Sequence, residues 1–285
     1  MANVRQMLPS DLDFAAGCTA AEGWGSETRP VFESFLAHDP AGCFVAELPP
    51  GERVGICVAT SYGQYGFVGE LIVVKERRGR GIGRQLLEHA VGYLRSRGAQ
   101  SILLDGAPAA IPLYERAGFR RVCRSLRFTG ALPGRAHPRA RAMQAADLEA
   151  VGRVDRRAFG ADRRFFLERH LSLQPELCRV LEDGGEIAGF IMGRRMGDRV
   201  AVGPWVVQPG VRRPGDLLES LAAEAGGDEV SLSLGILETA LEAAATVRSL
   251  GFADRPDPPW RMALGPAARL GVSPGCYAIG FAAKG

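Results

Sequence analysis

Short apolar stretches bounded by turn-forming residues recur along the N-terminal half of the chain, and such stretches predict β strands. They lie at Val4–Leu8, Cys43–Leu48, Val54–Thr60 and Phe67–Val74. The segment "PPGE" predicts a turn between the second and third strands. The residues that follow "PSD", up to Phe35, predict helical structure, for which Ser10 or Asp11 is a suitable N-cap.

The stretch Ile82–Arg97 has a helical pattern of apolar residues, spaced so that they share one face. These residues are Leu86, Leu87, Ala90, Val91 and Leu94. Beyond them, "SILLD" predicts a strand, "IPLYERAG" a short helix that starts with Pro112 and ends at Gly118, and "RRVCRSLRF" a closing strand. A strand meander followed by strand, helix and strand predicts a mixed α/β domain with helices on both faces of a mostly antiparallel sheet.

The pattern returns after a shift of about 134 residues. "VRQMLPSDL" (Val4–Leu12) matches "ARAMQAADL" (Ala140–Leu148), and "CFVAELPPGERVGI" (Cys43–Ile56) matches "CRVLEDGGEIAGF" (Cys178–Phe190). "LIVV" (Leu71–Val74) matches "PWVV" (Pro204–Val207), and "AAIPLYERAGF" (Ala109–Phe119) matches "AAATVRSLGF" (Ala243–Phe252). The sequence therefore predicts a tandem duplication with domains at 1–132 and 139–285, joined by the Gly- and Pro-rich linker 129–140.

Composition places the chain among ordinary folded proteins. Its 285 residues are 46% apolar and 24% charged, which is enough apolar material for a packed core. The net charge of +3 leaves basic and acidic residues nearly balanced, so a nucleic-acid partner is not expected. No run of 18 apolar residues and no apolar leader occur, so we expect a cytoplasmic protein without a membrane partner.

Cysteines and histidines show no spacing typical of a metal site. The six cysteines form no C-x-x-C pair, and several lie in apolar strand-like stretches, as reduced, buried cysteines do. The four histidines are scattered along the chain. We therefore expect no metal.

The chemistry-bearing motif is "RRGRGIGRQLL" at residues 77–87, between a predicted strand and a predicted helix. Glycine weakens regular structure by roughly 0.5–1 kcal/mol relative to alanine, so three closely spaced glycines indicate a tight bend that a ligand approaches closely. A dinucleotide fingerprint would need glycine at Arg84, and a P-loop would need a G-K-[ST] triplet, which is absent. The pattern R-x-x-G-x-G (Arg78, Gly81 and Gly83) at a helix N-terminus instead favours a pyrophosphate, which free amides and arginines would bind. The alternative is a plain glycine-rich turn with solvated arginines.

These residues resemble the GCN5-related N-acetyltransferases, the GNAT family. "LIVVKERRGRGIGRQLL" (Leu71–Leu87) is similar to that family's acyl-CoA pyrophosphate loop, and "IPLYERAGF" (Ile111–Phe119) to the helix that follows. "AEGWGSE", "HDPAGCFVA" and "LDGA" are similar to bacterial members that carry two such domains. The resemblance implies a sheet with splayed central strands and acetyl-CoA as cosubstrate.

The resemblance also implies which residues hold acetyl-CoA. The main chain of Leu71, Ile72 and Val73 would pair with the pantetheine arm. The loop would wrap the pyrophosphate with Arg78, Gly79, Arg80, Gly81, Gly83 and Arg84. One departure from the family is Ala107, which stands where many members carry an asparagine.

Two side chains are candidates for the chemistry, Tyr114 from the resemblance and Glu70 from its position just before the strand that would hold the thioester. Tyr114 would protonate the departing thiolate, since a phenol of pKa ~10 can serve a thiol of pKa ~8.5. Glu70 is the candidate base, and Asp105, at the end of the neighbouring strand, is its rival and a candidate acceptor contact. Trp24, in the loop "EGWGSE", is a second candidate acceptor contact. A packing role for Tyr114 and a solvated edge carboxylate at Glu70 remain open.

The second copy lacks the corresponding residues. Its loop "QPGVRRPGD" is shorter, Pro214 falls near a loop glycine, and Val247 stands where the first copy has Tyr114. We therefore predict one working site, in the N-terminal domain, that transfers an acetyl group from acetyl-CoA to a primary amine of a small molecule by direct attack. The alternatives are a non-catalytic acetyl-CoA sensor, acetylation of a protein lysine or N-terminus, and a purely structural role. We expect a monomer or weak homodimer.

Overall fold

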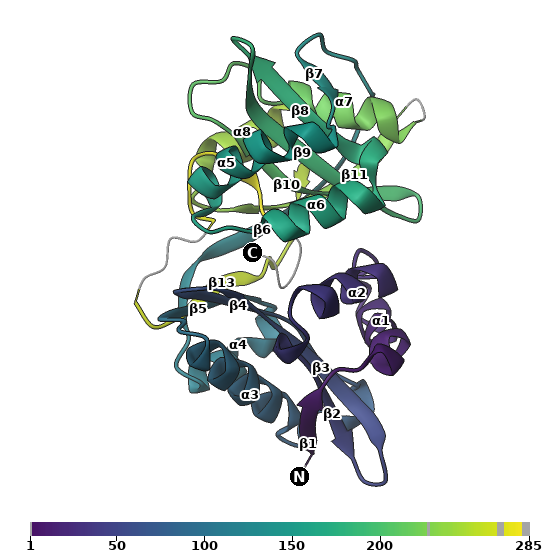
Figure 1. The fold of residues 1–285 in the computed structure, drawn as a ribbon, viewed down its shortest axis with the longest axis vertical. Helices are drawn as coiled ribbons and strands as arrows, with labels where there is room; N and C mark the ends of the chain where they lie inside the picture. Colours follow the sequence, from purple (N-terminus) through teal and green to yellow (C-terminus); the bar gives the residue numbers. More distant parts are fainter. Residues whose placement is uncertain (1, 227–228, 267–270, 281–285) are drawn as a thin grey trace. The chain divides into compact units, whose positions relative to one another are not determined.

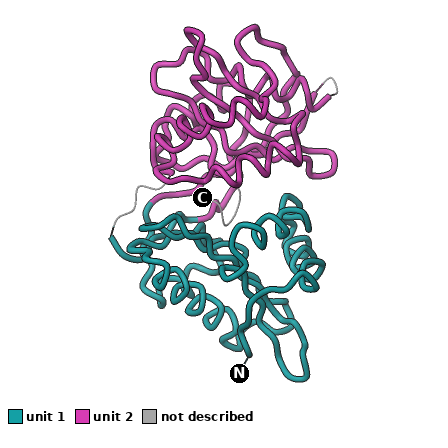
Figure 2. The backbone as a smooth tube through the Cα atoms, viewed as in Figure 1, with its two compact units in different colours: residues 1–122, 260–268, 282–285 teal, residues 123–259, 269–281 magenta. Residues whose placement is uncertain are grey.

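The structure is a computed structural model that describes residues 2–226, 229–266 and 271–280, and it divides into two compact units (Figure 2). The described residues of the first unit are 2–122 and 260–266, and those of the second are 123–226, 229–259 and 271–280. This division differs from the expected split at 129–140. The first unit stops at Val122, and it regains a segment from the C-terminal part of the chain.

The described residues of the first unit form a sheet between two helical layers (Figure 1). Its strand order is β1 (Asn3–Gln6), β2 (Cys43–Leu48), β3 (Glu52–Tyr62), β4 (Tyr65–Val73), β5 (Ser101–Gly106) and β13 (Trp260–Leu264). All neighbouring pairs are antiparallel except β4 with β5, which are parallel. Helices α1 (Leu12–Ala21) and α2 (Arg29–His38) cover one face, and α3 (Ile82–Ser96) and α4 (Ile111–Arg116) cover the other (Figure 1).

The predicted apolar stripe of α3 supplies the core on its face of the sheet. Leu86, Leu87, Ala90 and Leu94 are fully buried, whereas Val91 is half-buried at the edge of the stripe. They pack in one cluster with apolar residues of β2, β3, β4 and β5 and with Tyr114 of α4. Burial of such side chains contributes about 1.5–3 kcal/mol each, so this face fixes α3, and the loop before it, against the sheet.

The second unit repeats this architecture. Its sheet runs β6 (Arg120–Leu132), β11 (Val230–Leu237), β10 (Arg199–Val207), β9 (Glu186–Met196), β8 (Cys178–Asp183) and β7 (Ala140–Ala142). The short strands β12 (Ala253–Asp254) and β14 (Cys276–Ala278) pair with β6 and β10. Helices α5 (Leu148–Phe159) and α6 (Arg164–Leu173) pack on one face, and α7 (Asp216–Ala225) and α8 (Leu241–Ser249) on the other (Figure 1). The predicted fold class, a duplicated mixed sheet flanked by helices, is confirmed.

Each sheet contains a strand from the opposite half of the sequence. β13 follows nearly the whole second unit along the chain, yet it pairs antiparallel with β5 in the first, from Trp260 opposite Gly106 to Leu264 opposite Ile102. β6 continues from the first unit into the second, where its residues Ser125–Leu132 pair with β11. Part of the expected linker, Thr129–Leu132, is therefore strand. The sequence pattern could not reveal this exchange because it identifies strands but not their partners.

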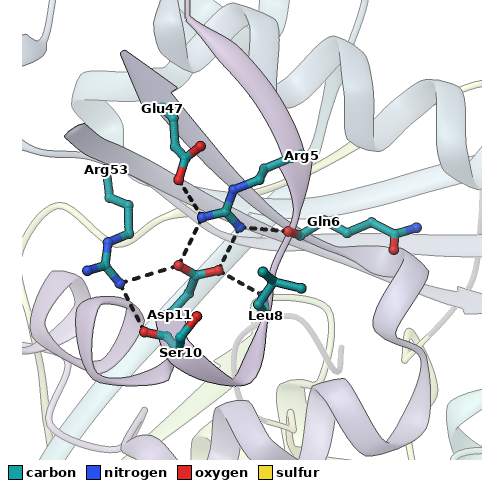
Figure 3. Close-up of polar contacts among 7 residues, drawn as sticks. All are labelled: Arg5, Gln6, Leu8, Ser10, Asp11, Glu47 and Arg53. Atoms are coloured by element: carbon teal, nitrogen blue, oxygen red, sulfur yellow. Dashed lines mark hydrogen bonds and ion pairs between the residues drawn. The ribbon is translucent and has the colours of Figure 1, made fainter. Parts of the chain in front are cut away.

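A polar corner shows the duplication in atomic detail (Figure 3). In the first unit Asp11 accepts two hydrogen bonds from Arg5, at 2.7 and 3.0 Å, and one from the Leu8 amide at 2.8 Å. Arg5 also pairs with Glu47, and Arg53 reaches Asp11 at 3.3 Å (Figure 3).

The second unit repeats this corner with the equivalent residues. Asp147 accepts two hydrogen bonds from Arg141, at 2.7 and 2.9 Å, and one from the Gln144 amide at 2.7 Å. Arg141 also donates to Glu182 at 2.7 Å. The same arginine, aspartate and glutamate thus close the same corner in both copies, which confirms the duplication inferred from the sequence.

The structure corrects one detail of the internal alignment. The Val74 amide donates to the Val54 carbonyl at 2.9 Å, and in the second unit the Gln208 amide donates to the Ala188 carbonyl at 2.7 Å. Val74 therefore corresponds to Gln208, and the stretch "LIVV" is matched by residues 205–208, one position later than expected. Val73 then corresponds to Val207.

Replacing Asp11 by Asn should make the protein less stable at neutral pH, by about 1–3 kcal/mol, because hydrogen bonds to a charged group are weakened. Although burial opposes it, the hydrogen bonds from Arg5 and Leu8 hold the pKa of Asp11 below its ordinary value. The stabilisation is therefore full above the unfolded-state pKa of about 3.9 and is lost as the pH falls through the folded-state value. Urea unfolding at pH 7, 5 and 3.5 checks this: the difference between wild type and Asp11→Asn should shrink with falling pH, and a constant difference would contradict it.

Candidate active site

The central strands of the first unit separate halfway along their length. β4 and β5 pair only from Tyr65 opposite Ser101 to Phe67 opposite Leu103. Beyond this point β5 remains paired with β13, and β4 remains paired with β3. Among the described residues no strand pairs with the edge of β4 beyond Phe67. This is the splay that the family resemblance implies.

A β-bulge lies in β4 just beyond the point of separation. Gly69 is opposite Val58 and Ile72 is opposite Ile56, so Glu70 and Leu71 together face the single residue between them on β3, Cys57. Glu70 has a φ of 51°, in the left-handed region that non-glycine residues seldom adopt. A bulge bends its strand and increases its local twist. The bulge is therefore a local cause of the separation of β4 from β5.

The bulge also places Glu70 inside the unit. Its side chain is 1% exposed, although the sequence left open a solvated position at the sheet edge. Burial raises the pKa of the Cys57 thiol, and the charge of Glu70 raises this pKa further. Glu70 and Cys57 are therefore close neighbours, and the thiol stays protonated.

The open edge of β4 presents main-chain groups of Val73. Because the Val74 amide donates to β3, strand alternation points the amide and carbonyl of Val73 to the opposite side. The Val73 carbonyl accepts a hydrogen bond from Arg78 Nε at 2.8 Å. By the same alternation the main chain of Ile72 faces β3. Of the two residues, it is Val73 that offers main-chain groups at the open edge.

The glycine loop ends in a helix N-terminus with free donors. Gly79 and Gly81 have φ of 76° and 79°, and Gly81 is the N-cap of α3. Within the described chain, no residue accepts a hydrogen bond from the amides of Gly79, Arg80 or Gly81. The first amides of a helix have no partner inside it, and the first turn of α3 contains no acidic residue. The loop is therefore an unshielded, partly positive surface.

The three loop arginines differ in what they contact. Arg78 pairs with Glu22 at the end of α1 as well as with the Val73 carbonyl, so its guanidinium connects α1 to the end of β4. Arg84 forms an exposed pair with Glu88, one helical turn away, at 2.7 Å. Arg80 forms no ion pair with a described residue. It is the loop arginine whose charge is not already balanced by a carboxylate.

Tyr114 is buried in the core of the first unit. It lies on α4, is 7% exposed, and packs edge-on against Phe119 with ring centroids 6.1 Å apart. Its ring also lies against Gly106 of β5, where a Cβ atom would come within 2.9 Å of the ring. Burial, with a smaller contribution from Cys57, raises the pKa of the Tyr114 hydroxyl well above its ordinary value. The phenol is therefore protonated throughout the neutral range.

Asp105 has a partner that the sequence did not predict. Arg261, fully buried on the exchanged strand β13, donates from Nε to Asp105 Oδ1 at 2.5 Å and from Nη2 to Oδ2 at 3.4 Å. The guanidinium also lies over the ring of Phe67, 5.0 Å from its centroid. A contact across 156 positions leaves no local signal in the sequence, and so Arg261 was missed. Asp105 is the counter-ion of this arginine, whatever else it binds.

Trp24 lies in the loop between α1 and α2 and is 37% exposed. Its amide donates to the Thr19 carbonyl at 2.9 Å, and its carbonyl accepts from the Glu27 amide at 3.2 Å, so the loop is a defined turn. Since nearby Glu22 pairs with Arg78, this loop lies at the same end of the unit as the glycine loop.

Comparison with known proteins identifies the family. Two family models match, the Acetyltransferase (GNAT) family over residues 8–119 and the Acetyltransferase (GNAT) domain over residues 151–271. The chain belongs to the GNAT acetyltransferases. It is a tandem member, with one family domain in each half.

Curated relatives match over short segments. Mycothiol acetyltransferase of Thermobispora bispora is 41% identical over 93 residues, which are 29% of this chain and 31% of that protein. N-alpha-acetyltransferase 30 of Schizosaccharomyces pombe is 39% identical over 66 residues, which are 22% of this chain and 44% of that protein. The chain thus matches less than half of the length of these two relatives.

Solved structures match over nearly the whole chain. A candidate acetyltransferase of Pyrococcus horikoshii has a TM-score of 0.80 at 23% identity and covers 100% of this chain and 96% of its own. A tandem GNAT protein from the clavulanic acid biosynthesis pathway has a TM-score of 0.59 at 17% identity, over 94% of this chain and 100% of its own. Because the sequence identities are only 23% and 17%, the structural similarity establishes the shared fold alone.

Two further observations concern membranes and metals. Helices long and apolar enough to span a bilayer are absent from the described residues. The same residues contain no cluster of three or more His, Cys, Asp or Glu side chains arranged to hold a metal ion.

Replacing Arg261 by Met should destabilise the protein by about 3–5 kcal/mol, because removal of one partner leaves a largely buried carboxylate without its cation. The double variant Arg261→Met with Asp105→Leu should recover much of that loss, since it leaves no unpaired charge. Arg29→Met, which breaks only exposed ion pairs, is the control and should leave stability nearly unchanged. Denaturant unfolding measures all three. An Arg261→Met protein as stable as the control would refute the structural role.

Proposed function

We propose that the first unit transfers an acetyl group from acetyl-CoA to a primary amine, with direct attack of the amine on the thioester. The observation that carries this proposal is the open edge of β4, which leads from the point of separation into the free amides of the glycine loop. An edge strand binds an extended chain through its main-chain groups, and a helix N-terminus binds phosphate. Together they match an extended arm that ends in a pyrophosphate.

The residues present fit acetyl-CoA, which is a substrate of the proposed reaction. The amide and carbonyl of Val73 would pair with the amides of the pantetheine arm, and Leu71 borders the same edge. The amides of Gly79, Arg80 and Gly81 and the first turn of α3, which includes Gly83 and Arg84, would bind the pyrophosphate. Arg80 would supply charge-assisted hydrogen bonds. Arg78 would act mainly by holding the end of β4, since its guanidinium already binds the Val73 carbonyl and Glu22.

The chemical step forms a C–N bond and breaks a C–S bond. The neutral amine attacks the thioester carbonyl, the amine loses one proton, and the departing thiolate gains one. Tyr114 would donate the second proton, and its raised pKa ensures that the proton is present at neutral pH. Glu70, buried at the bulge, is our candidate for receiving the first proton. Asp105 is less suited to that role because both of its oxygens bind Arg261.

The acceptor is our most specific proposal. We favour a small-molecule amine that contacts Trp24, and one matching relative is named for mycothiol. Another is named as an N-alpha-acetyltransferase, so a protein N-terminus or lysine is the alternative that the experiment must separate. Free thiol released with small amines supports the first acceptor class, and release only with peptides supports the second. Binding of acetyl-CoA without release of free thiol in the presence of any acceptor would indicate a sensor.

Replacing Gly81 by Ala should weaken acetyl-CoA binding by roughly 10- to 100-fold, because losing a well-aligned donor to a charged group costs about 1.5–3 kcal/mol. Gly98→Ala is a matched control. Gly98 follows α3, has a φ of 91°, and like Gly81 faces open space at its Cβ position. Both variants carry the same backbone strain, so both should lose stability, but only Gly81→Ala should lose affinity in calorimetric titration. Equal affinities would remove the loop from the binding site.

Replacing Tyr114 by Phe should lower kcat by about 10²–10⁴, the usual contribution of a general acid, because the thiolate then leaves without its proton. The Michaelis constant for acetyl-CoA should change little, since the main-chain contacts remain. Thiol release under steady state, measured from pH 6 to pH 10, checks this. A Tyr114→Phe enzyme with full activity over this range would assign the tyrosine a packing role only.

A further inference from the structure

The C-terminal strand of the second unit pairs with the strand edge that stays open in the first. β14 pairs antiparallel with β10, Ala278 opposite Trp205 and Cys276 opposite Val206. Just before β14, the Gly275 carbonyl accepts a hydrogen bond from the Val207 amide at 2.9 Å. Val207 corresponds to Val73, the residue that presents its amide at the open edge of β4. The same main-chain donor is thus satisfied by protein in the second copy.

The strands on either side of β14 separate as β4 and β5 do. β10 and β11 pair in parallel only as far as Val202 opposite Leu234. Beyond this point β14 lies against β10, and the next residue, Ile279, donates its amide to the Gly235 carbonyl of β11 at 2.9 Å. The segment Gly275–Ile279 therefore bridges the gap between the two separated strands. We call it the C-terminal insert.

Side chains and glycines fit the C-terminal insert closely. Tyr277 is buried, with its ring 5.0 Å from that of Trp205, and burial together with nearby Glu242 of α8 raises the pKa of its hydroxyl. A Cβ atom at Gly203 would lie 2.1 Å from the Ile279 carbonyl oxygen, and one at Gly235 would lie 3.0 Å from the Ile279 side chain. Both flanking strands thus carry glycine where the insert passes. Such complementarity indicates a permanent part of the fold.

The phosphate end of the second copy is also closed. α7 (Asp216–Ala225) has 10 residues, whereas α3 (Ile82–Ser96) has 15. At α7 the amides of Asp216 and Leu217 donate to the carbonyls of Arg213 and Pro214, at 3.1 and 3.2 Å. The nearly buried carboxylate of Asp216 lies at this helix start, where Arg213 binds it at 3.0 Å and Arg139 at 3.4 Å, so these charges are already paired within the unit.

We infer that the C-terminal insert replaces the pantetheine arm in the second unit, so that this unit takes no acyl-CoA and each chain binds one. The insert makes the hydrogen bonds of an added strand from inside the chain, where its effective concentration exceeds that of any free ligand. The inference rests on the proposed function for the identity of the ligand only. Closure of the second unit is a separate property of the fold.

Hydrogen exchange at residue resolution on the full chain tests this closure. Without ligand, the Val207 amide should exchange at least about a hundredfold more slowly than the Val73 amide, since among the described residues only the former has a hydrogen-bond acceptor. Added acetyl-CoA should slow exchange at Val73 and leave Val207 unchanged. Calorimetric titration should give one site per chain. Two sites, or new protection at Val207 on adding acetyl-CoA, would overturn the inference.

Variants of Tyr277 separate the insert from general stability. Tyr277→Ala in the full chain should speed exchange at Val207 by roughly tenfold or more, whereas Tyr277→Phe, which keeps the ring, should change it less. Exchange at Val180, a core residue of β8 on the other side of the sheet, reports whether the unit stays folded. If neither the wild type nor the variants bind acetyl-CoA, the proposed function fails. Exchange at the Val207 amide then tests the closure of the second unit by itself: slow exchange supports closure, and fast exchange refutes it.

Discussion

The separation of β4 from β5 is the constraint on which the first unit depends. Parallel pairing stops at Phe67 and Leu103, and the bulge at Glu70 turns β4 away from its neighbour. A sheet interrupted in this way leaves main-chain donors and acceptors along β4 that need partners. A ligand with amide groups can satisfy them, and the glycine loop lies directly beyond the end of the strand. Binding capacity thus comes from an incomplete hydrogen-bond ladder.

The two copies satisfy this constraint in opposite ways. The second unit has the same separation of strands, but its own residues 275–279 complete the ladder, and its helix α7 is five residues shorter than α3. The polar corner of Asp11 and Asp147, which holds the start of each unit, is nearly identical in both. Residues that maintain the fold have therefore stayed alike, whereas the parts that would hold a ligand have diverged. A duplicated domain that keeps the sheet without its ligand needs a substitute for the missing hydrogen bonds.

The exchanged strand makes the candidate site depend on the whole chain. β13 reaches the first unit only after the second has been traversed, and it brings the buried Arg261 to Asp105. A buried carboxylate and guanidinium stabilise the fold only as a pair, since either one alone would be a buried, uncompensated charge. Residues 1–122 therefore do not contain everything that their own sheet requires. This dependence gives a physical reason for the two domains to stay on one chain.

The sequence by itself determined most elements of the first copy, the duplication, the family and the glycine loop, because these depend on local periodicity, on turn residues and on motifs a few residues long. The α3 stripe and the matches near Asp11 and Asp147 are of this kind. Only the tertiary structure decided that Glu70 is buried in a bulge, that Arg261 binds Asp105 and that Tyr277 helps close the second unit. These contacts join residues far apart in the chain, or depend on strand register. Local patterns specify which segments become strands, but long-range packing selects their partners.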